Sequence, residues 1–167
     1  MCASKFRVRV ATPDDAAGIA AAHVDSIRSL GAAAYDPELV ADWGAPRTAE
    51  PYLQAMANGE HFFVAVDDHA RIVGFAAHRV ASGDHRVAVY VRGDASRRGL
   101  GTALFTAAEG VAQACGAREI HVDASLVAVR FYAANGFSTV EPASHALRSG
   151  RVMACVKMCK LLPPASG

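Results

Sequence analysis

The sequence contains no apolar run of 18 residues, and its first ten residues, MCASKFRVRV, include no apolar stretch of signal-peptide length. Neither a membrane-spanning helix nor a secretory signal is therefore predicted. The formal net charge is only +1, so the chain has no general positive field that would hold nucleic acid or an anionic membrane. We expect a soluble, cytoplasmic protein that must bind any phosphate-bearing ligand locally.

Cysteine is scarce, and its spacing is uninformative for metal binding. The chain has four cysteines, no two of which form a CxxC pair, and Cys155 and Cys159 are placed to share one face of a strand. We expect reduced thiols and no disulfide framework. None of the seven histidines stands at a spacing typical of metal ligands, so no metal site is predicted.

The composition, 52% hydrophobic and 20% charged residues, is that of an ordinary globular domain. We predict a single domain over residues 1–161, followed by a flexible tail, LPPASG, at 162–167.

Strand and helix periods alternate along the chain and predict a mixed α/β fold of six to seven strands and about four helices. Strands are expected at residues 6–11, 61–68, 69–80, 85–92, 118–125, 137–141 and 151–162. Helices are expected to start at Thr12 and Asp36, and further helices at residues 49–59, 100–115 and 126–136. The crossover from the strand at 85–92 to that at 118–125 should make these two parallel, while the other strands look antiparallel.

The segment DASRRGLGTALF, residues 94–105, places two glycines and two arginines at the start of a helix. A dinucleotide fingerprint would need a third glycine where Leu104 stands, and a Walker loop would need a Gly-Lys-Ser/Thr tripeptide that is missing. The favoured interpretation is a helix N-terminus whose backbone N–H groups and dipole, with Arg97 and Arg98, hold a pyrophosphate. A plain glycine-rich loop with solvated arginines is the alternative.

Two motifs carry a family resemblance. VAVYVRGDASRRGLGTALF, residues 87–105, resembles the cofactor motif Q/R-x-x-G-x-G/A of the GNAT superfamily of acyl-CoA-dependent N-acyltransferases, with Ser96 at the first position. SLVAVRFYAANGF, residues 125–137, resembles the later family motif N-x-x-A-x-x-x-Y-x-x-x-G-F, with Tyr132 at the tyrosine and Ser125 replacing the asparagine.

The resemblance implies the GNAT fold: a central, mostly antiparallel sheet with one splayed parallel pair of strands. It also implies acetyl-CoA as co-substrate and transfer of its acetyl group to a primary amine of a small molecule or peptide, by direct attack in a ternary complex. The pantetheine arm would enter between the fourth and fifth strands and pair with the backbone of Val89 and Val91. The remaining implied cofactor-binding residues are Ser96, Arg97, Arg98, Gly99, Leu100, Gly101, Thr102 and Ser125.

The resemblance assigns Tyr132 as the general acid for the departing thiolate, with ordinary aromatic packing as the alternative. His85 is the candidate general base because histidine titrates near neutral pH. A surface position of His85, a role for Asp84 and attack through water remain open. The first two helices and the loop before the last strand should recognise the amine, with Tyr35, Trp43 and His145 as candidates. Tyr35 and Trp43 could instead be core anchors.

Two other functions remain open. A non-catalytic acyl-CoA sensor or regulatory module is suggested by the serines at positions 96 and 125, and a nucleotide-binding α/β module by the glycines. The partners expected are acetyl-CoA and an amine acceptor, without nucleic acid or membrane, and the protein should be a monomer or a homodimer.

Overall fold

Seven strands form one mixed sheet in the order β1-β2-β3-β4-β5-β7-β6 in the computed structural model, which describes residues 5–164. The strands are β1 (Arg7–Val10), β2 (His61–Val66), β3 (Ile72–Ala81), β4 (Asp84–Val91), β5 (Glu119–Ser125), β6 (Ser138–Ala146) and β7 (Val152–Leu161). The helices are α1 (Ala16–Leu30), α2 (Pro37–Trp43), α3 (Glu50–Ala57), α4 (Leu100–Ala114) and α5 (Val129–Ala134). The mixed α/β fold, with the β4–β5 pair as its parallel pair, is confirmed.

The helix starts follow from local side-chain chemistry. Asp15 accepts a hydrogen bond from the Thr12 amide at 2.8 Å, and a 3-10 turn leads from there into α1. Asp36 accepts from the Leu39 amide, also at 2.8 Å, and Pro37 occupies the first position of α2. Both patterns satisfy amides that a helix N-terminus leaves without partners.

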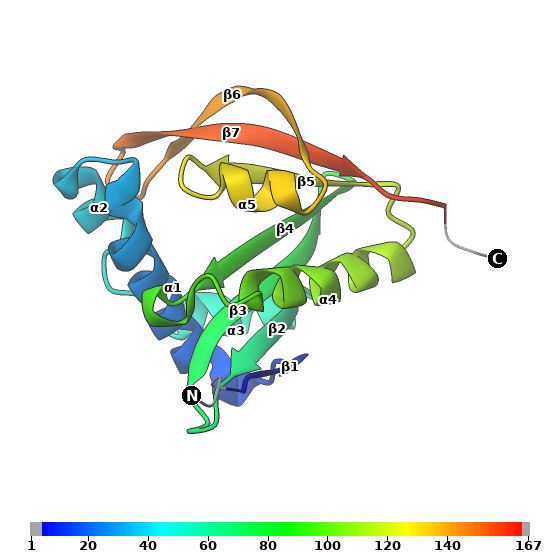
Figure 1. The fold of residues 1–167 in the computed structure, drawn as a ribbon, viewed down its shortest axis with the longest axis horizontal. Coiled ribbons are helices and arrows are strands. Elements are labelled where there is room, and N and C mark those ends of the chain that lie inside the picture. The colour runs from blue at the N-terminus through cyan, green and yellow to red at the C-terminus, as the bar shows by residue number, and fades with distance from the viewer. Residues whose placement is uncertain (1–4, 165–167) are drawn as a thin grey trace.

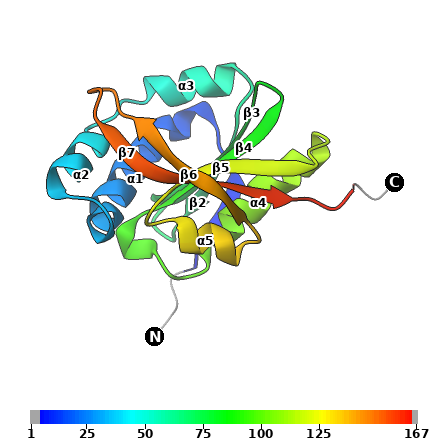
Figure 2. The same ribbon diagram turned by 90° about the horizontal axis from the view of Figure 1, so that it is seen from above.

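The two faces of the sheet are covered by different helices, α4 and α5 on one face and α1 to α3 on the other (Figures 1 and 2). On the α4 face, Leu104 and Phe105 pack against Ile120 and Met158, and all four side chains are buried. The opposite face has a separate core in which Ile19 of α1 is fully buried. These two cores hold the sheet between the helices. Within the sheet, β4 and β5 form the least extensive strand pairing.

The parallel strands β4 and β5 meet at a single residue pair, Arg86 opposite His121. Figure 1 shows the two strands diverging from that point toward their C-terminal ends. Arg86 also forms an ion pair with Asp123 at 2.6 Å across the seam. The sheet is therefore closed at the beginning of these strands and open at their ends, as the resemblance implied.

Two predicted boundaries are corrected. The strand expected at 137–141 continues to Ala146, so His145 lies in β6 opposite Met153 rather than in a loop. Pro142 is compatible with this strand because β6 is an edge strand, where a missing amide costs no ladder hydrogen bond. The tail expected from residue 162 begins later, since Leu162 is buried and its amide donates to the Arg118 carbonyl. Residues 165–167 of that tail lie outside the described residues.

Between residues 5 and 164 no helix combines the length and the apolarity needed to span a membrane.

Candidate functional site

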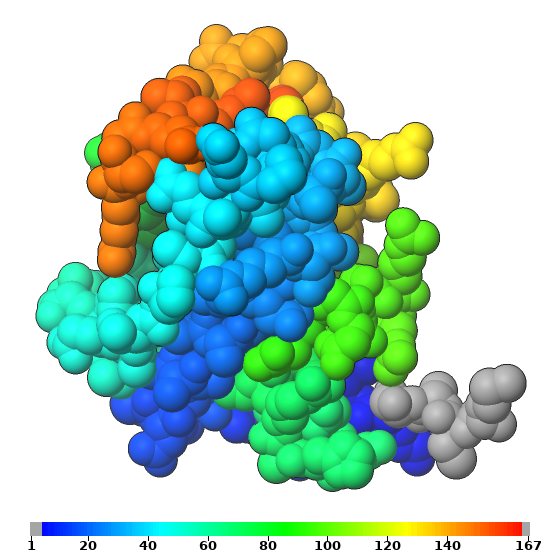
Figure 3. All heavy atoms as spheres, turned by 90° about the vertical axis from the view of Figure 1, so that its left-hand side faces the viewer, coloured from blue at the N-terminus to red at the C-terminus, as the bar shows by residue number. Residues whose placement is uncertain are grey.

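A cavity of about 280 Å³ opens where β4 and β5 separate. In Figure 3 a hollow lies between α3 and the ends of β6 and β7, with green atoms of the β4 region deep inside it. The walls come from both diverging strands, from β3, β6 and β7, from α5 and from the end of α2. The lining residues are Trp43, Glu60, Ala77, Arg79, Arg86, Val87, Ala88, Val89, Tyr90, Val122, Asp123, Ala124, Ser125, Ala128, Tyr132, His145, Met153 and Cys155.

Tyr132 projects from α5 into the gap between the strands. Its hydroxyl oxygen accepts a hydrogen bond from the Val89 amide of β4 at 3.2 Å, and only 3% of the residue is exposed. Burial raises the pKa of the phenol above its ordinary value, the nearby Tyr90 raises it further, and the Val89 bond lowers it. Since the Val89 amide donates to this oxygen, the phenolic proton is directed to another acceptor, and the phenol stays protonated at neutral pH.

The N-terminus of α4 has the backbone geometry that an anion site requires. Arg97 has a φ of 63° and the N-cap residue Gly99 a φ of 76°, both in the left-handed region. Such turns gather backbone N–H groups into an anion-binding concavity, and the first turn of any helix adds unpaired N–H groups and a positive partial charge. Arg97, Arg98 and Gly99 are exposed to solvent.

Gly101 permits close contact between this helix start and α5. A Cβ atom built on Gly101 would lie 2.8 Å from Cε2 of Phe131, which is shorter than real side-chain contacts. The glycine of the motif is therefore needed for packing between α4 and α5, and it places the loop next to Tyr132.

The loop before α4 is attached to α1 through one carboxylate. Asp25 accepts from the Gly93 amide at 3.0 Å and lies 3.5 Å from the Arg92 guanidinium. The hydroxyl of Ser96 donates to the Gly93 carbonyl at 2.9 Å. Ser96, the departure from the family motif, thus closes the turn in front of the helix with its own side chain.

On the opposite wall, Trp43 lines the cavity and Tyr35 supports it from behind. The Tyr35 ring meets the Trp43 ring edge to face at a centroid distance of 5.6 Å. Its hydroxyl donates to the Ala154 carbonyl at 2.6 Å and accepts from the Leu126 amide at 2.8 Å. Tyr35 is not among the lining residues; it connects the α1–α2 region to β7 and to the end of β5.

The cavity carries charges of both signs near its aromatic wall. Asp123 is paired with Arg86, whereas Glu60, directly before β2, has no ion pair among the described residues. His145 of the edge strand β6 also lines the cavity. Glu60 was missed in the sequence, where nothing distinguishes it from a solvated residue between a helix and a strand. Tyr90 of β4 was missed too. It stands between two valines, and alternation in a strand places its side chain on the opposite face of the sheet from theirs.

His85 is placed elsewhere. Its Nδ1 lies 2.9 Å from Nε2 of His78, and the two rings are stacked. His78 is buried and its Nδ1 lies 3.2 Å from that of His61, so three histidines form a chain across β2, β3 and β4. Burial, followed by its two histidine neighbours, lowers the pKa of His78 to about 4. His85 does not line the cavity because it precedes Arg86, where β4 and β5 are still joined.

The structure therefore brings together five of the predicted site residues around one cavity: Val89, Ser125, Tyr132, Trp43 and His145. Residues 96–102 form the adjoining helix start, and Val91 packs against the core on the α4 side. Tyr35 and His85 do not line the cavity.

The comparisons with known proteins agree with this arrangement. Residues 31–150 match the family model described as "Acetyltransferase (GNAT) domain". A search of curated proteins finds no match. A solved structure described as "GCN5-Related N-acetyltransferase: Aminotransferase, Class-II" from Rhodopseudomonas palustris superposes with a TM-score of 0.82 at 32% identity, covering 97% of this chain and 99% of that one.

Two more distant structures were solved with the coenzyme. The PaiA N-acetyltransferase of Thermoplasma acidophilum in complex with coenzyme A has a TM-score of 0.74 at 17% identity, over 95% of this chain and 99% of that one. A GNAT superfamily phosphinothricin acetyltransferase of Sinorhizobium meliloti in complex with AcCoA has a TM-score of 0.72 at 19% identity, over 97% of this chain and 94% of that one. At such identities the likeness is one of fold.

Proposed function

Because the chain belongs to the GNAT family of acetyltransferases, we propose that it transfers the acetyl group of acetyl-CoA to a primary amine of a small molecule or peptide. The observation that carries this proposal is the position of Tyr132, whose buried, protonated phenol lines the cavity between the parted strands. Two distant structural neighbours, described as complexes with coenzyme A and AcCoA, support the choice of co-substrate.

The helix start at residues 97–102 would hold the pyrophosphate. Its left-handed residues turn backbone N–H groups outward, and Arg97 and Arg98 add full positive charges to the helix dipole. Backbone groups of β4 beyond Arg86 face the gap, so an extended, amide-bearing arm can bind there as a strand would. Ser125 lines the gap from the opposite strand, β5.

The acetyl transfer needs one proton donor and one acceptor. The amine nitrogen forms the bond to the acetyl carbon while the carbon–sulfur bond breaks, and Tyr132 gives its phenolic proton to the departing sulfur. Holding the two reactants together supplies much of the rate, because the reaction within the ternary complex is effectively unimolecular.

The proton acceptor is a residue of the cavity rather than His85. Glu60 and His145 both line the cavity, whereas His85 is hydrogen-bonded to His78 beyond its closed end. Asp123 is less suited because its carboxylate is already paired with Arg86 at 2.6 Å. We assign the base to Glu60, because it is the lining carboxylate that has no ion pair within residues 5–164, and His145 is the second candidate among the lining residues.

The proposal is tested by measuring thiol release from acetyl-CoA over a panel of polyamines, amino acids, aminoglycosides and peptides with free N-termini. We expect turnover with one class of amine and a large loss of kcat in Tyr132→Phe with unchanged affinity for coenzyme A. Tyr52→Phe is the matched control, because Tyr52 is buried on the other side of the sheet and does not line the cavity. Tight acetyl-CoA binding without turnover on any amine would support the acyl-CoA sensor instead.

A further inference from the structure

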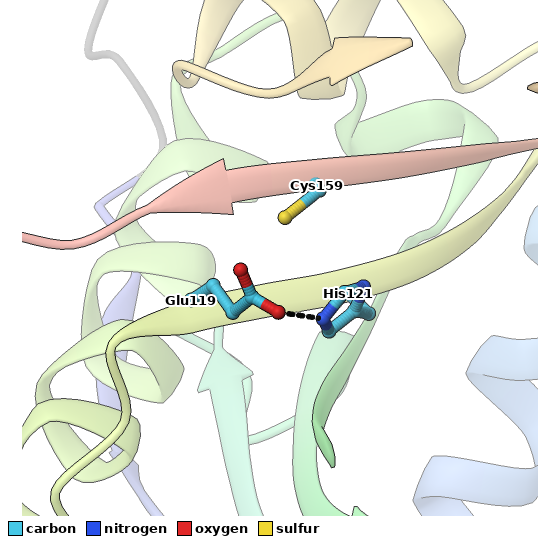
Figure 4. Close-up of side chains that lie close together, drawn as sticks. All are labelled: Glu119, His121 and Cys159. Carbon is cyan, nitrogen blue, oxygen red and sulfur yellow. Dashed lines mark hydrogen bonds and ion pairs between the residues drawn. The ribbon is translucent and has the colours of Figure 1, made fainter. Parts of the chain in front are cut away.

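Three metal-ligating side chains gather on one face of the β5–β7 pair. His121 of β5 lies directly opposite Cys159 of β7, and Glu119 precedes His121 by two residues on the same strand. Side chains two apart on a strand share a face, and directly opposed residues have neighbouring Cβ atoms. Figure 4 shows Glu119 and His121 projecting from β5 and the Cys159 sulfur turned toward both.

Their ligand atoms are already close to the separations that a bound ion requires. One carboxylate oxygen, one imidazole nitrogen and the sulfur all lie within 4.8 Å of one another. The Glu119 carboxylate is 2.9 Å from Nε2 of His121. Tetrahedral zinc bonds of about 2.0–2.3 Å put donor atoms about 3.3–3.7 Å apart. Small side-chain rotations therefore suffice, and the backbone of the two paired strands can remain in place.

The three side chains are partly exposed to solvent and partly buried. Glu119 is half exposed, with 49% of its side chain accessible, and His121 is 27% accessible. Cys159 is partly buried. A site of this kind admits an ion from solvent, and three protein ligands leave the fourth position of a tetrahedron to a water molecule.

The donor types select the ion. One carboxylate, one imidazole and one sulfur form a donor set of mixed hardness, which suits the borderline ion Zn²⁺. Mg²⁺ and Ca²⁺ would prefer oxygen ligands alone.

The cluster is distinct from the acetyl-transfer site. None of its three side chains lines the cavity. It lies at the closed end of the β4–β5 seam, where His121 makes the single bridge to Arg86. An ion held there would link β5 to β7 next to the point at which β4 and β5 part.

We propose that Glu119, His121 and Cys159 form a zinc site that joins β5 to β7 outside the cavity. The sequence argues against a metal because His121 and Cys159 are far apart in the chain, and only the strand register brings them together. The ion stabilises this part of the sheet and takes no part in acetyl transfer.

The test uses the untagged, chelator-treated protein, titrated with Zn²⁺ against a chromogenic chelator and separately with Co²⁺. We expect one equivalent to bind, and a sulfur-to-cobalt charge-transfer band to appear in the near ultraviolet. Cys159→Ser should abolish the band and weaken zinc binding about 100-fold or more, since even the loss of an outer-shell partner costs about 10–100-fold. Cys115→Ser, at the exposed end of α4, is the matched control and should change neither result.

Glu119→Gln and His121→Gln provide independent tests, and circular dichroism checks that each variant is folded. Because Glu119 is half exposed, Glu119→Gln leaves the core undisturbed. Weaker zinc binding by this variant therefore cannot be ascribed to unfolding. A zinc affinity of the wild type within tenfold of that of Cys159→Ser, or a cobalt complex without the sulfur band, overturns the proposal.

Discussion

The Tyr132 hydroxyl and the Val89 amide are 3.2 Å apart across the gap between α5 and β4. This bond fixes the phenol oxygen at the edge of β4 and leaves its proton available to a partner in the cavity. Because burial raises the pKa of Tyr132 above its ordinary 10.0, the phenol keeps its proton throughout the range in which amines become neutral.

The first prediction concerns the pH dependence of kcat. With a saturating amine, kcat should not fall with rising pH below about pH 10, because the raised pKa delays the loss of the Tyr132 proton. In Tyr132→Phe, kcat should be lower by about 100-fold or more at every pH. A descending limb with an apparent pKa well below 10 in the wild type would mean that another group is the acid.

The second prediction compares two glycines of α4. Gly110 has open space around its Cα, so Gly110→Ala should raise the free energy of unfolding by up to about 1 kcal/mol. Gly101→Ala should lower it by about 1–3 kcal/mol, because the new methyl group meets the Phe131 ring. It should also weaken coenzyme A binding, since the displaced helix start is the proposed pyrophosphate site.

Urea unfolding and calorimetric titration with coenzyme A measure the two effects. Equal changes in both variants would refute the packing role of Gly101, and a Gly101→Ala protein that binds coenzyme A normally would separate that role from cofactor binding.

The third prediction concerns Tyr35, which supports the cavity wall from behind. Tyr35→Phe removes two hydrogen bonds to main-chain groups, each contributing about 0.5–1.5 kcal/mol, so the free energy of unfolding should fall by about 1–3 kcal/mol. The KM for the amine should rise more than the Kd for coenzyme A, because Trp43 loses its rigid neighbour. An unchanged urea midpoint together with an unchanged KM would show that Tyr35 only fills space.

The fourth prediction concerns acid stability and His23 of α1. Its Nδ1 lies 2.7 Å from the Tyr52 hydroxyl, and burial, with the charge of Arg47, lowers its pKa to about 3. The unfolded chain, with a pKa near the ordinary 6.5, binds the proton first as the pH falls. Stability is therefore lost below pH 6.5, at up to about 1.4 kcal/mol per pH unit for this group.

His23→Gln should reduce the slope of unfolding free energy between pH 6.5 and 5, where few carboxylates titrate, to the part that His78, whose pKa is lowered to about 4, still contributes. His69→Gln, in the exposed turn between β2 and β3, is the matched control and should leave that curve unchanged. A slope in His23→Gln equal to that of the wild type would show that other groups carry the acid sensitivity.

The elements of the fold were predictable because their signals are local. Thr12 with Asp15, and Asp36 with Pro37, start helices through contacts within one turn. The glycines at the start of α4 predict a helix N-terminus with exposed backbone amides. β6 was predicted too short because a proline usually argues against a strand, and the sequence does not reveal that this strand lies at the edge of the sheet.

The site was less predictable because it depends on register. The motif places Tyr132 correctly beside the gap, but whether His85 faces the cavity depends on where β4 and β5 separate. That point is a contact between distant segments, Arg86 and His121, with no local signature. The same limit hid Glu60 among the residues that line the cavity and the opposition of His121 to Cys159.

The single bridge between β4 and β5 also gives this sheet an internal edge. An edge on the outside of a sheet invites pairing with any extended chain and is a route to aggregation. Beyond Arg86 the edge faces the cavity, which Ala128 and Tyr132 also line. A slender, extended arm with its own amide groups, as in the proposed co-substrate, suits such an edge, so a feature that favours aggregation on a protein surface would here favour ligands of that shape.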